Sequence, residues 1–263
     1  MRAPRLVASD LDGTLVRSDG TVSDRTRAAL AGIERAGCVF VMVTGRPPRW
    51  MRQVSEQTGH RGLAVCANGA VVYDLHTERV VRTDLLSADA ARGVVEALRR
   101  ELPGIAFAVE RPELGFAHEA SYRPRWDSAD DKATAPVEEL VASGVVKLLA
   151  RHEEMAADAL LAAARTAVGD AATLTHSSSD GLLEVSGVGV TKASGLAALA
   201  AEHGVEPGEV VAFGDMPNDL PMLAWAGHAV AVANAHPEVL AAADEVTAGN
   251  DADGVALVLE RWI

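Results

Sequence analysis

Short apolar runs alternate with amphipathic segments over the first third of the chain. Residues 5–9, 38–43 and 63–66 are apolar and have the length of strands. Residues 23–37 show helical spacing between a serine that suits an N-cap and a closing glycine, and a second helix is expected to begin at Pro47. This strand–helix–strand repetition predicts an α/β fold with a doubly wound parallel sheet.

The last third of the chain resumes the same rhythm. The expected elements are a helix at 191–203, a strand at 210–213, a short helix at 219–224, a strand at 229–232, and helices at 237–243 and 253–261. These elements are expected to complete the sheet that the first third begins.

The middle of the chain follows a different pattern. It contains expected helices at 88–101 and 153–168 and strand-like pieces at 105–110, 145–150, 172–176 and 182–185. A crossover between parallel strands needs only about a dozen residues, so a segment of this length predicts an inserted domain. We therefore expect a core made of residues 1–84 and 187–263, with an inserted α/β domain at 85–186.

Composition narrows the class of protein. The chain has 263 residues, of which 49% are hydrophobic, and this excludes a disordered protein. Apolar runs such as 39–43 are too short to span a membrane, and no signal-peptide segment precedes the first strand, so we expect a cytoplasmic protein. Cys38 and Cys66 lie in apolar runs and are interpreted as packing residues. The histidines lack metal-ligand spacing, so no zinc site is expected.

The formal net charge of −13 bears on the partners. It argues against nucleic acid or an anionic membrane as the main partner, because no basic stretch offsets it. It leaves anionic small molecules open, since a bound metal and helix N-termini can supply local positive potential.

The first candidate motif runs from Asp10 to Thr14, directly after the first apolar run. Two carboxylates two residues apart, on a backbone that Gly13 allows to turn, can point into one site. An acidic surface turn or part of a calcium loop gives a similar pattern, but the calcium pattern needs a third ligand and a later glutamate that residues 15–18 do not provide. We interpret this motif as functional.

Two further motifs precede or open expected helices. Thr44, Gly45 and Arg46 follow the second strand, where a hydroxyl and a glycine amide can hold a phosphate oxygen or simply cap a helix. Lys192 lies in the first turn of the helix after the insertion, where a cation opposes the helix dipole. A bound anion would account for this lysine, although most lysines are only solvated.

The fourth motif, residues 214–219, follows the strand at 210–213. Asp215 is a candidate metal ligand, Asn218 can cap the next helix or hold phosphate, and Asp219 can orient its neighbours. Helix capping alone also explains acidic residues at this place.

The four motifs are more informative together, because each lies beyond the C-terminal end of an expected strand, where open parallel sheets form their sites. Mg²⁺ prefers carboxylate oxygens, so two aspartates and a backbone carbonyl are enough to hold it. Phosphoryl transfer needs a nucleophile, charge neutralisation and a proton donor. Asp10, the metal with Lys192 and Thr44, and Asp12 can fill these three roles.

In this order the motifs resemble those of the haloacid dehalogenase superfamily. The insertion, placed after Asn68 and before Lys192, is similar to that of its Cof-type branch (type IIB, with a C2 cap). The resemblance spans essentially the whole chain, including Asn234–Ala235 and residues 253–255. It implies a Rossmann-like core and an inserted cap that closes over the site.

By this resemblance Asp10 attacks phosphorus and forms an aspartyl-phosphate, and Asp12 serves first as an acid and then as a base. The resemblance also implies that Mg²⁺ is held by the side chains of Asp10 and Asp215 and by the main-chain carbonyl of Asp12, with Asp219 in support. The residues it implies for phosphate or substrate are Leu11 through its amide, Thr44, Gly45, Arg46, Asn68, Lys192 and Asn218.

The expected function is that of a Mg²⁺-dependent phosphatase acting on small phosphorylated metabolites. Sugar phosphates are the first candidates, followed by pyridoxal phosphate or a flavin-pathway intermediate. A phosphohexomutase of the same fold and a non-catalytic phosphometabolite sensor stay open as alternatives, although Asp10 and Asp12 both argue against the sensor. Candidate substrate contacts in the insert are Tyr122, Arg123, Arg125, Trp126, Lys147 and His176. The sequence leaves the oligomeric state open.

Overall fold

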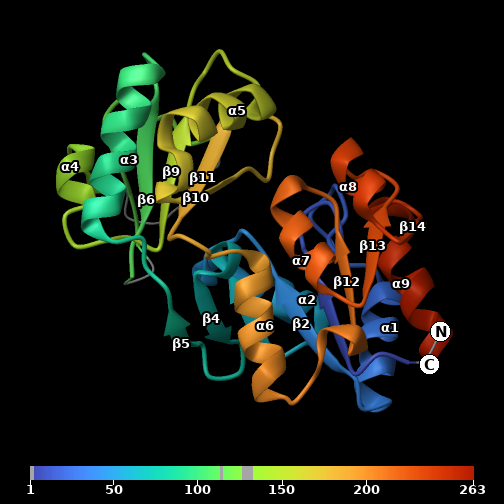
Figure 1. Cartoon of the computed structure of the whole chain (residues 1–263). Coiled ribbons are helices and arrows are strands. Elements are labelled where there is room, and N and C mark those ends of the chain that lie inside the picture. The colour runs from blue at the N-terminus through green and yellow to red at the C-terminus, as the bar shows by residue number, and fades with distance from the viewer. Residues whose placement is uncertain (1–2, 113–114, 126–132) are drawn as a thin grey trace. The chain divides into compact units, whose positions relative to one another are not determined.

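The computed structural model describes residues 3–112, 115–125 and 133–263, and the chain divides into two units (Figure 1). We call Met1–Arg82 with Thr191–Ile263 the core unit, and Thr83–Val190 the insert unit. The boundaries expected from the sequence, at 84/85 and 186/187, lie within four residues of these.

An eight-stranded sheet forms the centre of the core unit, in the order β14-β13-β12-β1-β2-β3-β4-β5. Its parallel strands are β1 (Leu6–Ser9), β2 (Val39–Val43), β3 (Leu63–Cys66), β12 (Val210–Gly214), β13 (His228–Val232) and β14 (Glu245–Thr247). β1 lies between β2 and β12, so the chain builds the sheet outward from β1 in both directions. The predicted α/β, doubly wound class is confirmed.

Helices cover the core sheet, and every residue of β1 is buried, as expected for a strand with both faces packed. The helices are α1 (Asp24–Arg35), α2 (Met51–Thr58), α6 (Lys192–Glu202), α7 (Leu220–Trp225), α8 (Pro237–Ala242) and α9 (Gly254–Leu259). α1 packs against α9, and α6 packs against α7. The predicted cap of α1 is present, because the side chain of Ser23 accepts a hydrogen bond from the Thr26 amide.

Short 3₁₀ turns join several of these elements. They are η1 (Pro48–Trp50), η2 (Ala67–Gly69), η4 (Pro207–Glu209), η5 (Pro217–Asp219), η6 (Asn250–Ala252) and η7 (Glu260–Trp262). The helix expected from Pro47 therefore begins as a 3₁₀ turn and becomes α-helical at Met51. Two edge features of the sheet were not predicted. One is β14, and the other is formed by the neighbouring strands β4 (Val71–Asp74), which pairs antiparallel with β3, and β5 (Arg79–Thr83).

The insert unit contains a six-stranded sheet in the order β10-β11-β9-β6-β7-β8. Its strands are β6 (Ala106–Glu110), β7 (Phe116–His118), β8 (Ala133–Thr134), β9 (Lys147–Arg151), β10 (Thr173–Thr175) and β11 (Leu182–Ser186). Its helices are α3 (Ala88–Glu101), α4 (Val137–Leu140) and α5 (Ala157–Val168), with a 3₁₀ turn η3 (Gly169–Ala171). β7, β8 and α4 were not predicted.

The two faces of the insert sheet differ in chemistry. One face packs with the helices into an apolar cluster that includes Phe107, Leu148 and Leu183. Because side chains alternate along a strand, the neighbouring Lys147 and Glu184 lie on the other face. Among the described residues, no helix combines the length and the hydropathy needed to cross a membrane.

Candidate active site

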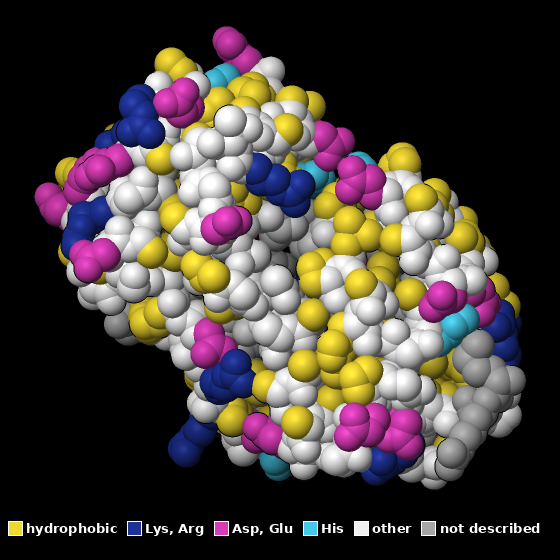
Figure 2. Space-filling model, in the orientation of Figure 1, with side chains coloured by type: hydrophobic (Ala, Val, Ile, Leu, Met, Phe, Trp, Pro, Cys, Tyr) yellow, Lys and Arg dark blue, Asp and Glu magenta, His cyan; other side chains and the backbone are white. Residues whose placement is uncertain are grey.

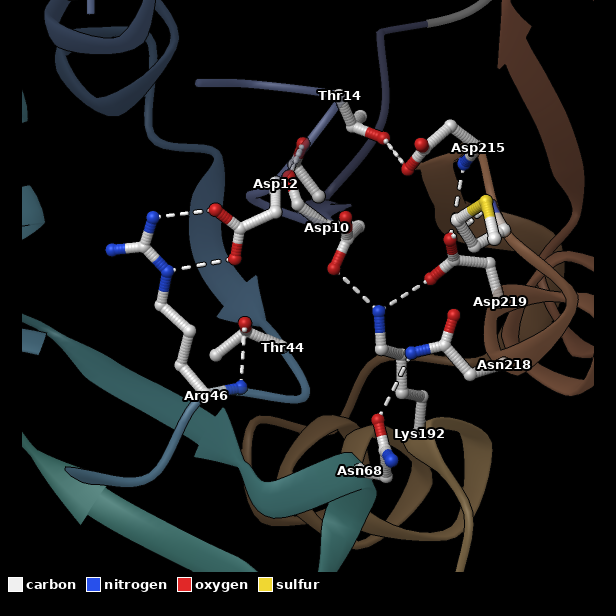
Figure 3. Close-up of polar contacts among 12 residues, drawn as sticks. Asp10, Asp12, Thr14, Thr44, Arg46, Asn68, Lys192, Asp215, Asn218 and Asp219 are labelled. Atoms are coloured by element: carbon white, nitrogen blue, oxygen red, sulfur yellow. Dashed lines mark hydrogen bonds and ion pairs between the residues drawn. The ribbon is translucent and has the colours of Figure 1, made fainter. Parts of the chain in front are cut away.

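Four loops of the core unit meet at the C-terminal edge of its parallel strands. Asp10 follows β1, Thr44 follows β2, Asn68 follows β3 and Asp215 follows β12, and Figure 3 shows these side chains converging. The parallel pairing of β1 with both β2 and β12 brings three of these ends together. Three of the four sequence motifs therefore meet at the edge where open α/β sheets bind ligands, together with Asn68, and the fourth motif, Lys192, joins them through its hydrogen bond to Asp10.

A buried lysine lies at the centre of the site. The Nζ of Lys192 donates hydrogen bonds to Oδ1 of Asp10 and to Oδ1 of Asp219, the latter at 2.6 Å. Burial alone would lower the pKa of Lys192, but the adjacent charges of Asp10 and Asp219 raise it above its ordinary value. The unfavourable position of this cation at a helix start is therefore offset by two carboxylates.

Three carboxylates surround this lysine. Oxygens of Asp10, Asp215 and Asp219 all lie within 4.8 Å of one another, and all three residues are buried. Burial, followed by the negative charge of Asp219, raises the pKa of Asp215 to about 6. Burial is also the largest cause that raises the pKa of Asp10 well above its usual range. Acidic groups packed in this way favour a proton or a cation.

Asp219 is less available to a ligand than the other two aspartates. Its Oδ2 accepts hydrogen bonds from the main-chain amides of Asp215 and Met216, each at 3.0 Å, while Oδ1 accepts from Lys192. Both of its oxygens thus hold the loop and the lysine in place. Asp219 therefore fits the supporting role expected from the sequence, and Asp10 and Asp215 are the carboxylates best placed for a metal.

Gly13 and Thr14 shape the pocket beside Asp215. The hydroxyl of Thr14 donates to Oδ1 of Asp215 at 2.8 Å. A Cβ at position 13 would lie 2.3 Å from Oδ2 of Asp215, and Gly13 has a φ of +83° that disfavours other residues. Thr14 belongs to the first motif, but sequence reasoning gave it no role, because a hydroxyl that orients a distant carboxylate leaves no local signal.

The carboxylate of Asp12 is turned toward Arg46 (Figure 3). Nε of Arg46 donates to Oδ2 at 2.7 Å and a terminal nitrogen donates to Oδ1 at 2.5 Å, which forms a two-pronged ion pair. The Asp12 side chain is 59% exposed. The sequence interpretation assigned Arg46 to phosphate or substrate, whereas in this structure its guanidinium is engaged by Asp12.

The remaining predicted phosphate ligands come from the same set of loops. Oγ1 of Thr44 accepts from the Arg46 amide at 3.0 Å, and Nδ2 of Asn218 donates to Oδ1 of Asn68 at 3.0 Å. Gly45 lies in the same loop as Thr44. The side chain of Leu11 is fully buried in the core, so only its main chain can serve a ligand.

Asn234 was missed as a residue that supports the site. Its Nδ2 donates to the Gly13 carbonyl at 2.8 Å, and its Oδ1 accepts from the Asn250 amide at 2.9 Å. It therefore ties the loop after β13 to the first motif. The sequence signal was present, because Asn234–Ala235 was recognised as part of the resemblance without a role.

The insert candidates lie in varied environments. Lys147 is buried and donates to Oε1 of Glu184 at 2.5 Å, and buried His176 lies 2.8 Å from Oδ1 of Asp158. Tyr122 is buried with the Arg151 guanidinium 5.8 Å from its ring centre. Arg123 is exposed, Arg125 is exposed and pairs with Asp180 and Glu153, and Trp126 lies outside the described residues.

Comparison with known proteins identifies the family. A family model described as haloacid dehalogenase-like hydrolase matches residues 7–259, so the chain belongs to the haloacid dehalogenase-like hydrolase family. The resemblance found in the sequence is thereby confirmed. Its relatives named as phosphatases place the chain among the phosphoric monoester hydrolases of this family.

Two relatives and one solved structure illustrate the likeness. The 5-amino-6-(5-phospho-D-ribitylamino)uracil phosphatase YcsE of Bacillus subtilis is 28% identical, over 98% of this chain and 96% of its own length. Endoribonuclease YBEY, chloroplastic, of Arabidopsis thaliana is 29% identical over 96% of this chain, which spans only 45% of that longer protein. A sugar phosphatase of subclass IIB has the same fold, with a TM-score of 0.84, 21% identity and coverage of 98% of both chains.

Proposed function

We propose that this protein is a Mg²⁺-dependent phosphatase that hydrolyses small phosphorylated metabolites through an aspartyl-phosphate on Asp10. The observation that carries the proposal is the buried Asp10 carboxylate, held by Lys192 within an acidic cluster at the C-terminal edge of the sheet. A buried carboxylate with one oxygen fixed by an ammonium leaves its other oxygen to attack phosphorus.

The reaction proceeds in two displacements. An oxygen of Asp10 bonds to phosphorus as the bond from phosphorus to the leaving oxygen breaks, and Asp12 supplies the proton that the leaving alcohol needs. Water activated by Asp12 then cleaves the acyl phosphate, which releases inorganic phosphate and restores Asp10. Lys192 offsets negative charge beside the nucleophile throughout.

The metal site is proposed on the side chains of Asp10 and Asp215 and the main-chain carbonyl of Asp12. The donor set fits Mg²⁺, because this ion prefers a few carboxylate oxygens and retains several waters. The position also fits, since the pKa of Asp215 is raised to about 6 by burial and by Asp219, and a cation would relieve this crowding of acids. When bound, Mg²⁺ would neutralise charge on the phosphoryl group.

The two units are proposed to contact different parts of the substrate. All proposed phosphate and metal groups belong to the core unit, and the phosphoryl group is common to every substrate. We therefore propose that the insert unit selects the organic part of the substrate. Because YcsE is named for a phosphorylated ribityl compound, phosphates of sugars and sugar alcohols are the first candidates.

The test is a panel of phosphate esters assayed for inorganic phosphate release with Mg²⁺ and without a bisphosphate activator. The proposal expects release from at least one sugar phosphate or sugar-alcohol phosphate. Transfer of phosphate to a second sugar hydroxyl would identify a mutase instead. Binding of the esters without turnover would indicate a sensor, and either result would overturn the proposal.

A further inference from the structure

Two buried side-chain amides in the core unit have one unpartnered polar atom each. Nδ2 of Asn218 donates to Oδ1 of Asn68 at 3.0 Å, while Oδ1 of Asn218 and Nδ2 of Asn68 are buried without a hydrogen-bond partner. Asn68 is 2% exposed and Asn218 is 5% exposed. Unpartnered amide atoms at this depth are costly unless a ligand or a change of orientation satisfies them.

The backbone of Asn68 is held in an unusual conformation. Asn68 and the preceding Ala67 both have positive φ, at 57° and 50°, in the turn after β3. Left-handed backbone at non-glycine residues persists only where the surroundings impose it, and it is found most often at functional sites. Asparagine is among the residues that tolerate this conformation best.

Neighbouring contacts fix this turn against the catalytic loops. The Asn68 amide donates to the Thr44 carbonyl at 3.0 Å, and the Ala67 amide donates to the Arg46 carbonyl at 2.9 Å. A Cβ on Gly69 would lie only 1.9 Å from the carbonyl oxygen of Thr191, the residue before Lys192. The Asn68 side chain is thus placed at a set position beside Asn218.

The amide of Asn218 can be hydrogen-bonded in either of two senses. In the arrangement of Figure 3 its nitrogen points to Asn68 and its oxygen points toward Asp219. A half-turn of both amides exchanges the atoms, so that Nδ2 of Asn68 donates to Oδ1 of Asn218. The NH₂ group of Asn218 then faces the site and can donate to a phosphoryl oxygen, where a carbonyl oxygen would repel it.

We propose that Asn68 is a positioning residue, which orients the amide of Asn218 so that its NH₂ group donates to the phosphoryl group. This inference rests on the proposed function. Asn68 acts by donating to Oδ1 of Asn218, and its left-handed backbone is the feature that presents the donor.

The test compares Asn68→Asp with Asn68→Gly. Aspartate keeps the shape and tolerates the left-handed backbone, but it can only accept, so it fixes Asn218 with its oxygen toward the phosphoryl group. Glycine suits the backbone and leaves Asn218 free to turn. We expect Asn68→Asp to weaken binding of inorganic phosphate by about tenfold or more, and Asn68→Gly to weaken it less. If Asn68 had a purely structural role, Asn68→Gly would weaken phosphate binding more than Asn68→Asp.

Binding is measured as the rise in Tm that inorganic phosphate produces in the presence of Mg²⁺, with the inhibition constant for phosphate as a second readout. Glu78→Gly provides a matched control, because Glu78 is exposed and has a φ of 53° in a turn outside the site. It should change Tm without changing phosphate affinity.

Direct repulsion between the introduced carboxylate and phosphate is separated from orientation by repeating the comparison in an Asn218→Ala background. If Asn68 acts through Asn218, the penalty of Asn68→Asp over wild-type Asn68 largely disappears there. An undiminished penalty, or a milder effect of Asn68→Asp than of Asn68→Gly in the single variants, would overturn the inference. A wild-type protein that neither binds phosphate nor hydrolyses esters would overturn the proposed function and this inference with it.

Discussion

The core unit and the insert unit both bury charged side chains, but they hold them in different ways. In the core unit Asp10, Lys192 and Asp219 come from three separate parts of the chain, namely the loop after β1, the start of α6 and the turn η5, and they meet at the edge of the sheet (Figure 3). In the insert unit Lys147 and Glu184 lie on the neighbouring strands β9 and β11 of one sheet. The first group depends on the whole topology, and the second depends on a single strand pairing.

The charge balance of the two groups also differs. In the core unit three buried carboxylates share one ammonium group, so the group has an excess of negative charge. On the strands β6, β9 and β11 of the insert unit, the buried acids Glu110 and Glu184 are matched by the buried bases Lys147 and Arg151. Since buried charge needs compensation, the core group favours a proton or an added cation, whereas this strand group is neutral by itself.

On the face seen in Figure 2, the charged side chains show no such imbalance. Figure 2 shows basic and acidic side chains interspersed on the visible face, without a single-sign patch that would point to a polyanionic partner. The buried charges are therefore more informative about function than the charges on this face.

The largest expected effect comes from the nucleophile. Asp10→Asn keeps the size of the side chain but removes its negative charge, so no phosphoenzyme should form and turnover should fall by about 10⁴-fold or more. The phosphoenzyme is measured after rapid quenching in acid, either as labelled phosphate bound to the protein or by mass spectrometry. Label on the Asp10→Asn protein, under conditions that label the wild type, would contradict the assignment of Asp10.

Removing the metal should have the next largest effect. EDTA is expected to abolish hydrolysis, Mg²⁺ should restore it, and Ca²⁺ should restore it poorly because its larger shell loosens the geometry. Asp215→Asn should raise the Mg²⁺ concentration needed for half-maximal activity. Full activity in excess EDTA would show that the acidic excess of the core unit serves another purpose.

Substitutions of Asp12 and Arg46 should reduce the hydrolysis of some substrates more than that of others. Asp12→Asn is expected to reduce hydrolysis of alkyl phosphates by about 10²–10⁴-fold, because these leaving groups need a proton. The loss should be smaller for p-nitrophenyl phosphate, whose leaving group is stable as an anion. Arg46→Ala should show the same bias more weakly, since the ion pair fixes the Asp12 carboxylate. If Arg46→Ala reduced the hydrolysis of alkyl phosphates and of p-nitrophenyl phosphate equally, Arg46 would have no part in proton transfer.

The fold of the core unit was largely readable from the sequence, because its parallel strands are short apolar runs followed by turn residues and capped helices. β3 (Leu63–Cys66) of the core unit falls at the predicted residues, as does α3 (Ala88–Glu101) of the insert unit. The pair β4 and β5 was missed, since β5 is mostly exposed and its Arg79–Thr83 sequence has no alternation of apolar and polar positions. Edge strands are defined by their pairing more than by their own pattern.

The site was readable as a set of motifs but not as a set of contacts. The positions of Asp10, Asp215 and Lys192 were predicted, because each follows a strand end or opens a helix. The contacts between site residues were not predicted, since the ion pair of Arg46 with Asp12 and the hydrogen bond between Asn218 and Asn68 join residues far apart in the chain. Such contacts follow from tertiary packing, which no local pattern encodes.

A further prediction concerns the buried pair of the insert unit. Lys147→Ala removes the ammonium group that contacts the buried Glu184, so we expect a loss of about 3–5 kcal/mol in the free energy of unfolding. Lys147→Met combined with Glu184→Leu should cost much less, because it removes both charges. Urea unfolding followed by a probe in the insert unit measures both variants. Equal destabilisation by the single and the double variant would show that the two charges do not depend on each other.

The smallest expected effect on stability comes from Arg125, which lies at the surface of the insert unit. Its ion pairs with Asp180 at 2.9 Å and Glu153 at 3.2 Å join side chains that are each at least 39% exposed. Such pairs contribute about 0–1 kcal/mol, so Arg125→Ala should leave Tm almost unchanged. If the insert unit selects the organic part of the substrate, the same variant should nevertheless alter the ranking of sugar phosphates while sparing p-nitrophenyl phosphate. Lys192→Ala, in contrast, should depress all substrates together, because it acts on the phosphoryl group that they share. An alanine scan across the described residues of the insert unit that never reorders the panel would contradict this division, whatever the activity of the core unit.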